Sequence, residues 1–437
     1  MKLLKLILKL NQDIFILINI IFILSKNILK IRSPKSKKIF CIVLKEERLN
    51  SVYKALENKG VTLFYLSRGF IDVAFNYYLD DYIRDPKGRD FWIFKAYKMM
   101  PRERALFIRH NNKLFRLLKK ITLKAKIFLL LPKYNDDYTL DLLNSAYMQD
   151  IWTVVYDREG MPAKHREVKI SKVISGIAAP VNHVITYNKN HTNFFKNIFG
   201  KINSESIIDQ IGYPLLDNYL CKGKIKSNKP FSKKLNNILF FAFGPISAVL
   251  GEEFINSKED KLPWENMLKE IHDELSTYLY QNPSNFLIYR RSKRGTRDYS
   301  KYSEKILNLK NCIEPNSETS SINLIAEANK IIVFQSTALI EALYSEKVII
   351  YPGWSSYHKE LVNKGILHNH NELWDNNLIY FANSPKNFYE LLVNSKPPTE
   401  KQKAKRIEYA IKFTNNRTGN VGEIAANKIL ERFKKYN

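Results

Sequence analysis

Two motifs place polar side chains directly after apolar runs, where buried strands are expected to end. In the second half of the chain, Phe334 ends such a run, and Ser336 and Thr337 follow it. A serine or threonine at this point caps the next helix, and the helix N–H groups and dipole then form an anion site. We expect a phosphate there, with Glu341 one turn deeper on the same face to accept hydrogen bonds from a ribose. The alternative is a capped helix with a solvated glutamate.

The other motif follows the apolar run 152–156 in the first half. Asp157 and Glu159 stand beside Gly160. Two carboxylates at the end of a strand suit general-base work on a hydroxyl, and the glycine lets another molecule approach the backbone closely. Arg158 lies between the carboxylates and is expected to hold at least one of them ionised. The alternative is a polar turn in which the aspartate caps a helix.

A cluster of cations follows the apolar run 286–290. Five of the eight residues 290–297 are Lys or Arg, beginning with Arg290 and Arg291. The planar guanidinium matches phosphate oxygens, so this segment is suited to clamp a phosphate. A solvated basic loop is the alternative. Gly244, which follows the apolar run 237–243, completes the candidate phosphate-binding residues.

Short β-branched or aromatic runs alternate with longer amphipathic segments from residue 38 onward, which is typical of βαβ units with parallel sheets. Strands are expected at 39–44, 61–66, 126–131, 152–156, 183–187 and 207–211, and then at 237–243, 286–290, 331–334 and 348–351. Helices are expected at 263–280, 322–328, 337–344 and 422–436.

The fold class predicted from this alternation is α/β, with two Rossmann-like doubly wound domains. The expected organisation is an N-terminal segment 1–36, a first domain 37–218, a polar Lys-rich linker 219–235, a second domain 236–415 and a C-terminal helix 416–437. Open α/β sheets bind ligands outside the carboxyl ends of their strands. The function is therefore expected in a central cleft between the two domains.

The charge of the chain points to a polyanionic partner. The 437 residues contain 70 Lys and Arg against 43 Asp and Glu, a formal net charge of +27. Nucleic acid, anionic lipid and phosphorylated substrates all fit this charge. The sequence has no P-loop, GxGxxG, GxSxG, HExxH or zinc-finger spacing, so ATPase, dehydrogenase, hydrolase and metal-site predictions lose their main support. Nucleic-acid binding would depend on charge alone, and we do not expect it.

The N-terminus is basic and apolar. Residues 14–24 are all apolar except for one asparagine, but this run is shorter than the roughly 20 residues that cross a bilayer. Lys2, Lys5 and Lys9 precede it on one helical face, and six cations lie within 26–38. We expect peripheral or monotopic attachment to an anionic membrane surface, with a membrane span or a buried helix as alternatives. A second basic segment, 102–126, is either a membrane-facing helix or a solvated one.

Together these features resemble the GT-B glycosyltransferases, and more narrowly the bacterial surface and capsular polysaccharide enzymes that include Kdo-transferases, sialyltransferases and polysialyltransferases. Arg158-Glu159-Gly160 matches the acidic motif of their first domain, and Ser336-Thr337 matches the Ser-Ser/Thr motif of the second. The resemblance implies that the first domain binds the acceptor and the second binds the nucleotide-sugar. It assigns Glu159 as general base, with Asp157 as its substitute, and Glu341 to the glutamate that follows the second motif.

One motif of these families is absent. Arg290-Arg291-Ser292 stands where a His-Pro segment is expected, and Arg290 or Arg291 would stabilise the leaving phosphate instead. The resemblance implies a transferase that needs no cofactor and no obligatory metal. Its expected partners are a nucleotide-sugar donor, a glycan or lipid-linked acceptor and the cytoplasmic face of the inner membrane.

Other functions fit parts of the sequence. A CDP-glycerol or ribitol-phosphate polymerase and a nucleotide-sugar 2-epimerase share the fold. An inactive scaffold for polysaccharide assembly would explain the missing His-Pro segment, and a nucleic-acid-binding protein fits the charge only. The donor, the acceptor, the linkage and the oligomeric state are not encoded in any motif of the sequence.

Overall fold

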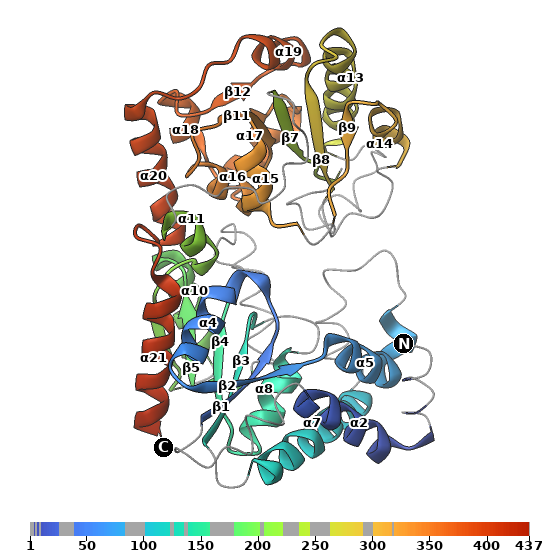
Figure 1. Ribbon diagram of the computed structural model, residues 1–437, viewed down its shortest axis with the longest axis vertical. Coiled ribbons are helices and arrows are strands. Elements are labelled where there is room, and N and C mark those ends of the chain that lie inside the picture. The colour runs from blue at the N-terminus through green and yellow to red at the C-terminus, as the bar shows by residue number, and fades with distance from the viewer. Residues whose placement is uncertain are drawn as a thin grey trace. The chain divides into compact units, whose positions relative to one another are not determined.

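The computed structural model describes residues 4, 7, 10–25, 39–83, 101–122, 126–134, 139–157, 179–201, 205–221, 236–244, 263–291, 300–316 and 319–436. These residues form two compact units (Figure 1). Unit 1 holds the described residues up to Cys221 and those from Thr414 onward, and unit 2 holds the described residues between them. The expected C-terminal helix thus belongs to unit 1. The first three residues of the expected linker, 219–221, belong to a short helix.

Unit 1 contains a six-stranded parallel sheet in the order β2-β1-β3-β4-β5-β6. Its strands are β1 (Ile39–Leu44), β2 (Val61–Leu66), β3 (Lys126–Leu131), β4 (Trp152–Tyr156), β5 (His183–Thr186) and β6 (Ile207–Gln210). The first four end where the sequence pattern predicts. β5 and β6 each end one residue early, because the chain leaves the ladder before Tyr187 and Ile211.

The helices of unit 1 cover both faces of this sheet. They are α2 (Gln12–Ser25), α4 (Asn50–Asn58), α5 (Arg68–Ile83), α7 (Pro101–Ile121), α8 (Thr139–Tyr147), α10 (Lys189–Lys201), α11 (Asp217–Cys221) and α21 (Val421–Tyr436), with short 3-10 turns at Glu47–Leu49 and Pro214–Leu216.

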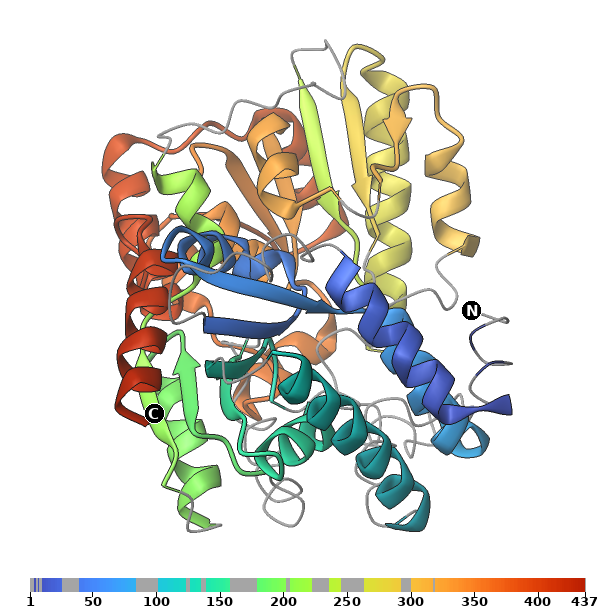
Figure 2. The same cartoon turned by 60° about the horizontal axis from the view of Figure 1, so that its bottom comes forward.

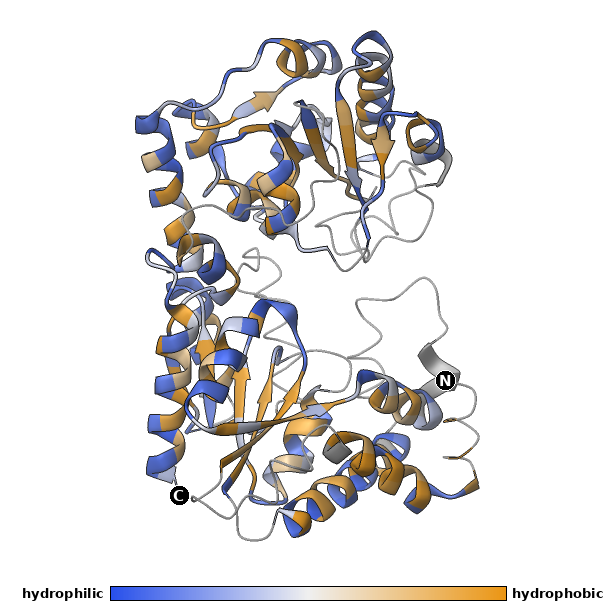
Figure 3. Cartoon of the chain, viewed as in Figure 1, coloured by the Kyte–Doolittle hydropathy of each residue, from blue (hydrophilic) through white to orange (hydrophobic). Residues whose placement is uncertain are grey.

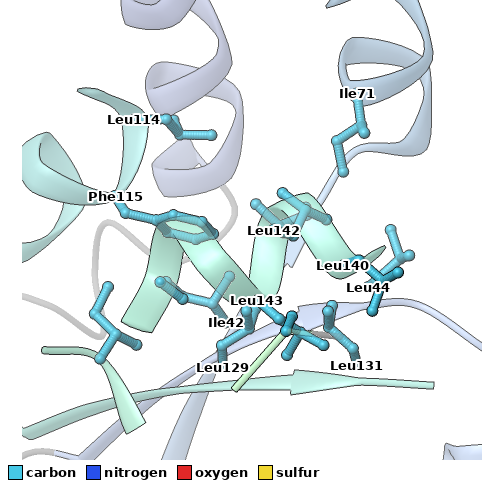
Figure 4. Close-up of a cluster of buried hydrophobic side chains, with 14 of the residues drawn as sticks. Ile42, Leu44, Ile71, Leu114, Phe115, Leu129, Leu131, Leu140, Leu142 and Leu143 are labelled. Atoms are coloured by element: carbon cyan, nitrogen blue, oxygen red, sulfur yellow. The ribbon is translucent and has the colours of Figure 1, made fainter. Parts of the chain in front are cut away.

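Side chains from strands and helices form one apolar core on one side of the sheet (Figure 4). Alternate residues of a strand point to the same face, so Ile42 and Leu44 of β1 join Leu129 and Leu131 of β3. Residues of α5, α7 and α8 cover them, among which Phe115 is fully buried. Burial of this kind is the main favourable term in folding.

The opposite face of the sheet is covered by α21, the last helix of the chain. Phe433 packs on Phe128 of β3 and on Trp152 of β4. The start of the helix is held by the buried Asp217, whose carboxylate accepts hydrogen bonds from the backbone N–H groups of Val421 at 3.1 Å and Gly422 at 2.6 Å. A carboxylate at this position caps the helix and favours its dipole. The cap fixes α21 to unit 1.

Gly422 is expected to be intolerant of a larger side chain. A Cβ atom there would lie 2.7 Å from the Ser51 carbonyl carbon of α4, so the Gly422→Ala protein is expected to lose about 1–3 kcal/mol of unfolding free energy. Gly200 in α10 has no atom within 4 Å of the same position. The Gly200→Ala protein should gain up to about 1 kcal/mol by helix propensity. Urea unfolding of both proteins measures the difference, and equal effects would contradict the close α4–α21 packing.

Unit 2 also contains a six-stranded parallel sheet, in the order β12-β11-β10-β7-β8-β9. Its strands are β7 (Asn237–Phe241), β8 (Phe286–Arg290), β9 (Cys312–Ile313), β10 (Lys330–Val333), β11 (Val348–Pro352) and β12 (Tyr380–Ala382). The sequence pattern missed β9 and β12, which are only two and three residues long. It placed the end of β7 two residues too far along the chain.

The helices of unit 2 are α13 (Glu265–Gln281), α14 (Ser300–Leu307), α15 (Ser321–Glu327), α16 (Thr337–Ala342), α17 (Ser356–Asn363), α18 (Asn371–Asp375), α19 (Pro385–Asn394) and α20 (Glu400–Thr414). α16 ends two residues before the expected position 344, because the chain turns there before it enters β11. The two sheets confirm the predicted α/β class with two doubly wound domains.

The apolar N-terminal run forms α2, which is coloured as hydrophobic along most of its length in Figure 3. In the part of the chain that the structure describes, no helix is both long enough and apolar enough to span a membrane.

Candidate functional site

The candidate site of unit 2 lies at the carboxyl edge of its sheet, where the strand order reverses. β7 is the first strand of the unit, β8 lies on one side of it and β10 on the other. The turns that leave β7 and β10 therefore diverge, and in open α/β sheets this point is where ligands bind. Gly244 follows β7, and Ser336 and Thr337 follow β10. The structure brings these three sequence-predicted residues to one edge.

Aromatic packing and pairing beyond the strands hold this edge together. Phe243, after β7, stacks on Phe334, after β10, with ring centroids 4.6 Å apart. The N–H of Ala242 donates to the carbonyl of Arg290 at 2.9 Å, which continues the β7–β8 pairing. Gly244 is buried directly after this stack. The ends of β7, β8 and β10 therefore lie together at this edge.

Ser336 is presented by a turn that its neighbour Gln335 fixes. The Gln335 amide donates to the hydroxyl of Tyr351 and to the carbonyl of His368, both at 2.9 Å, and its carbonyl accepts from the His368 N–H at 3.2 Å. Tyr351 in turn lies 3.0 Å from Nε2 of His358. The Ser336 hydroxyl accepts from the Ala338 N–H at 3.2 Å and so caps α16, as predicted, and this residue is exposed.

Glu341 is buried, with 3% of its surface exposed, so the solvated glutamate considered above is wrong. Its carboxylate accepts a hydrogen bond from the hydroxyl of Ser321, the first residue of α15. The preceding residue, Ser320, caps α15 by accepting from the Asn323 N–H at 3.2 Å. Glu341 thus connects α16 to the start of α15. The contact with a ribose stays a prediction.

The two arginines at the end of β8 contact the loop before α15. Arg290 donates to the carbonyls of Asn316 at 2.9 Å and Thr319 at 3.1 Å. Arg291 forms an exposed ion pair with Glu314, with Nε 3.0 Å from Oε1. Arg290 therefore positions the loop that leads to α15. Its predicted contact with a leaving phosphate stays a prediction.

The candidate site of unit 1 lies at the carboxyl edge of β3, β4 and β5. Asp157 follows β4 and is buried, with 3% of its surface exposed. Its Oδ2 accepts from the N–H of Tyr134, after β3, at 3.1 Å, and its Oδ1 lies 3.9 Å from Nε2 of His191. The Tyr187 N–H, after β5, donates to Nδ1 of His191 at 3.3 Å. Three consecutive strand ends are thus joined through one carboxylate.

Glu159 lies two residues beyond Asp157, outside the residues that the structure describes, as do Arg158 and Gly160. Sequence reasoning missed Tyr134, His191 and Gln335, which orient the predicted residues. Gln335 directly precedes Ser336, and this position was the one signal in the sequence that could have indicated its role. The link from Tyr134 to Asp157 spans 23 residues and no local pattern announces it. Among the described residues, no three His, Cys, Asp or Glu side chains gather as metal ligands.

The fold is similar to that of several solved structures. A UDP-N-acetylglucosamine 2-epimerase aligns with 92% of this chain and 98% of its own, at a TM-score of 0.53 and 10% identity. The MnaA–UDP complex of S. aureus aligns with 92% of this chain and 97% of its own, at a TM-score of 0.50 and 13% identity. The wall teichoic acid polymerase TagF aligns over 97% of both chains, at a TM-score of 0.50 and 11% identity.

No protein-family model and no curated protein matches the sequence. The likeness to the solved structures therefore concerns the fold, and it does not select the Kdo-transferase or sialyltransferase branch of the surface-polysaccharide enzymes. What the structure confirms is the predicted fold class, two α/β units that each contain a parallel six-stranded sheet.

Proposed function

We propose that this protein is a glycosyltransferase that moves a sugar from a nucleotide-activated donor to a growing surface polysaccharide or a lipid-linked acceptor. The observation that supports this most is the position of Gly244, Ser336 and Thr337 around the switch point of the unit 2 sheet. A nucleotide diphosphate needs closely approaching backbone N–H groups and small side chains, and this edge supplies both.

The donor would lie on unit 2. The exposed Ser336 hydroxyl and the N–H groups that open α16 would bind its phosphates, and Glu341 would reach the ribose if its bond to Ser321 is exchanged. Because α16 has only six residues, its backbone N–H groups contribute more to this binding than its dipole does. Arg290 and Arg291 would add charge that stabilises the departing phosphate. The acceptor hydroxyl would lose its proton to Glu159 of unit 1.

Nucleotide binding tests the donor site. A thermal-shift screen against CMP, CDP, UDP and GDP, at low and high salt, is expected to give a salt-resistant rise in melting temperature with one of them. The Ser336→Ala/Thr337→Ala protein should lose most of this rise. Ser384→Ala is the matched control, because Ser384 caps α19 in the same unit by accepting from the Asn387 N–H at 3.1 Å.

Both variants lose a cap worth about 1 kcal/mol, but only the first is expected to weaken nucleotide binding. Equal nucleotide shifts in the two variants would show that the α16 cap does not bind the donor. Shifts with a short DNA duplex alone, lost at high salt, would favour a nucleic-acid-binding protein instead.

A nucleotide-sugar 2-epimerase is the second candidate, because two of the similar folds are a UDP-N-acetylglucosamine 2-epimerase and a UDP complex. An epimerase converts free nucleotide-sugar, whereas a transferase releases nucleotide only when acceptor is present. Incubation with sugars carried by the nucleotide that the screen identifies, with and without a membrane extract as acceptor, separates the two functions. The likeness to TagF makes a CDP-glycerol polymerase a further outcome of the same assay.

A further inference from the structure

Helix α2 is apolar on nearly every side, yet only one side is covered by unit 1. Its inner face contributes Phe15, Ile16, Ile20 and Ile23 to the core. Phe15 packs on the ring of Phe70 in α5, with centroids 5.4 Å apart. A helix that is hydrophobic all round is normally buried in a protein core or in a membrane. These four residues of the inner face are four of the ten apolar residues of α2.

The outer face of α2 and the residue just before it carry exposed apolar side chains, which we call the α2 stripe: Leu10, which precedes the helix, and Ile14, Leu17 and Ile21 within it. Their exposed fractions are 76%, 50%, 54% and 57%. Within the helix, the spacing of three and four residues places Ile14, Leu17 and Ile21 on one face. Single exposed apolar residues are common on protein surfaces, but a contiguous patch marks a contact surface.

Helix α7 presents a matching basic stripe to solvent, formed by Arg102, Arg109, Lys113, Arg116 and Lys120. All five are exposed. They are spaced by seven, four, three and four residues, which places them on one face of the helix. Glu103 is the one acidic residue of α7, and Asp13 is the one acidic residue of α2.

An ion pair between Lys113 and Asp13 joins the two helices at the edge of both stripes. Apolar and basic surfaces therefore lie side by side. In both views of the fold, α2 lies at the opposite side of unit 1 from α21 (Figures 1 and 2).

We propose that the α2 stripe docks into the surface of a membrane that contains anionic lipids, with the α7 basic stripe on the headgroups. Apolar side chains flanked by Lys and Arg are the pattern of helices that lie in the interface plane. A second copy of this chain fits less well, because α2-to-α2 docking would bring two basic stripes together. This inference does not depend on the proposed transferase activity.

Vesicle co-sedimentation of the full chain tests the docking. Wild-type protein should bind vesicles containing phosphatidylglycerol more tightly than vesicles of phosphatidylcholine alone, and less tightly as salt rises. Leu17→Glu/Ile21→Glu should lower the partition coefficient at least about tenfold, since two apolar contacts are lost and two anions added. Arg116→Glu/Lys120→Glu should lower it by about fivefold or more for each charge reversed.

Matched controls change the same kinds of residue elsewhere. Ile424→Glu alters an exposed apolar residue of α21, and Lys401→Glu/Lys405→Glu reverses two exposed charges of α20. Both should bind vesicles within about twofold of the wild type, apart from the general effect of net charge. Leu17→Ser is a milder change if the double variant fails to fold. Because the altered α2 side chains are exposed, melting temperatures should stay close to the wild type.

Two results would overturn the proposal. One is vesicle binding by Leu17→Glu/Ile21→Glu that equals binding by the controls. The other is a wild-type dimer in sedimentation velocity that this variant dissociates, with no vesicle binding, because the α2 stripe would then be an interface between copies.

Discussion

Replacing Glu159 with glutamine is expected to lower the rate of sugar transfer by roughly 100- to 10,000-fold, the usual contribution of a positioned general base. The change removes the proton acceptor and keeps the shape of the side chain. Donor affinity, measured as the concentration of nucleotide-sugar that gives half of the thermal shift, should be nearly unchanged. A loss confined to turnover is the signature of an interaction made only in the transition state.

Asp157, the substitute base considered from sequence, has a different expected role. It is buried and accepts the backbone N–H of Tyr134, so it orients the chain that follows β3 rather than facing solvent. Asp157→Ala should leave that N–H buried without its acceptor and cost about 1–3 kcal/mol of unfolding free energy. It should also lower transfer, because the segment that leads to Glu159 loses its anchor.

The pair of variants separates the two roles. Glu159→Gln is expected to change turnover but not stability, whereas Asp157→Ala changes both. Near-normal turnover in Glu159→Gln would show that the base assignment is wrong. If, in addition, Asp157→Asn abolished transfer without any loss of stability, Asp157 would be the base.

The strands were predictable because each is a short apolar run bounded by polar turns. β1, β2, β3 and β4 begin and end where the pattern predicts, since buried parallel strands are apolar on both faces. β9 and β12 were not predictable, because two or three residues carry no periodicity. They form only because β8 and β11 offer an open edge.

The site residues were predictable as types and positions but not as contacts. A serine after a buried strand implies a helix cap, and the Ser336 cap is confirmed. Arg290, by contrast, suggested a phosphate clamp, but its guanidinium donates to carbonyls of a loop 26 and 29 residues away. Such long-range contacts depend on how the sheet folds, which a linear pattern does not contain. Glu341 is buried for the same reason, because Ser321 approaches it from α15.

Acidification from pH 7.5 to 5 is expected to cost several kcal/mol of unfolding free energy, because the fold buries histidines in their neutral form. Burial lowers the pKa of His110 to about 4, that of His358 to about 4 and that of His370 to about 3. In the unfolded chain these groups titrate near 6.5, so between that pH and their folded pKa the unfolded state binds more protons. Each histidine then contributes a loss of about 2 kcal/mol at pH 5.

Carboxylates act in other ranges of pH. Burial raises the pKa of Asp209, but hydrogen bonds from His183 and Arg432 outweigh it and hold the pKa well below its usual value. Its stabilisation is therefore lost only as the pH falls below about 4. Burial raises the pKa of Asp217, so its protonation acts in the opposite direction and favours the folded state on acidification. The loss between pH 6.5 and 5 thus reports mainly on the histidines.

His110→Phe tests this assignment within unit 1. The imidazole packs between the rings of Phe15 and Tyr78, with centroids 5.8 and 5.9 Å away, and its Nδ1 has no hydrogen-bond partner among the described residues. A phenyl ring fills a similar space and cannot be protonated. Urea unfolding at pH 7.5 and at pH 5 gives the difference in unfolding free energy between the variant and the wild type. This difference should favour the variant by about 2 kcal/mol more at pH 5 than at pH 7.5. The same pH dependence in both proteins would mean that His110 is protonated without cost in the folded state, so that its site admits water.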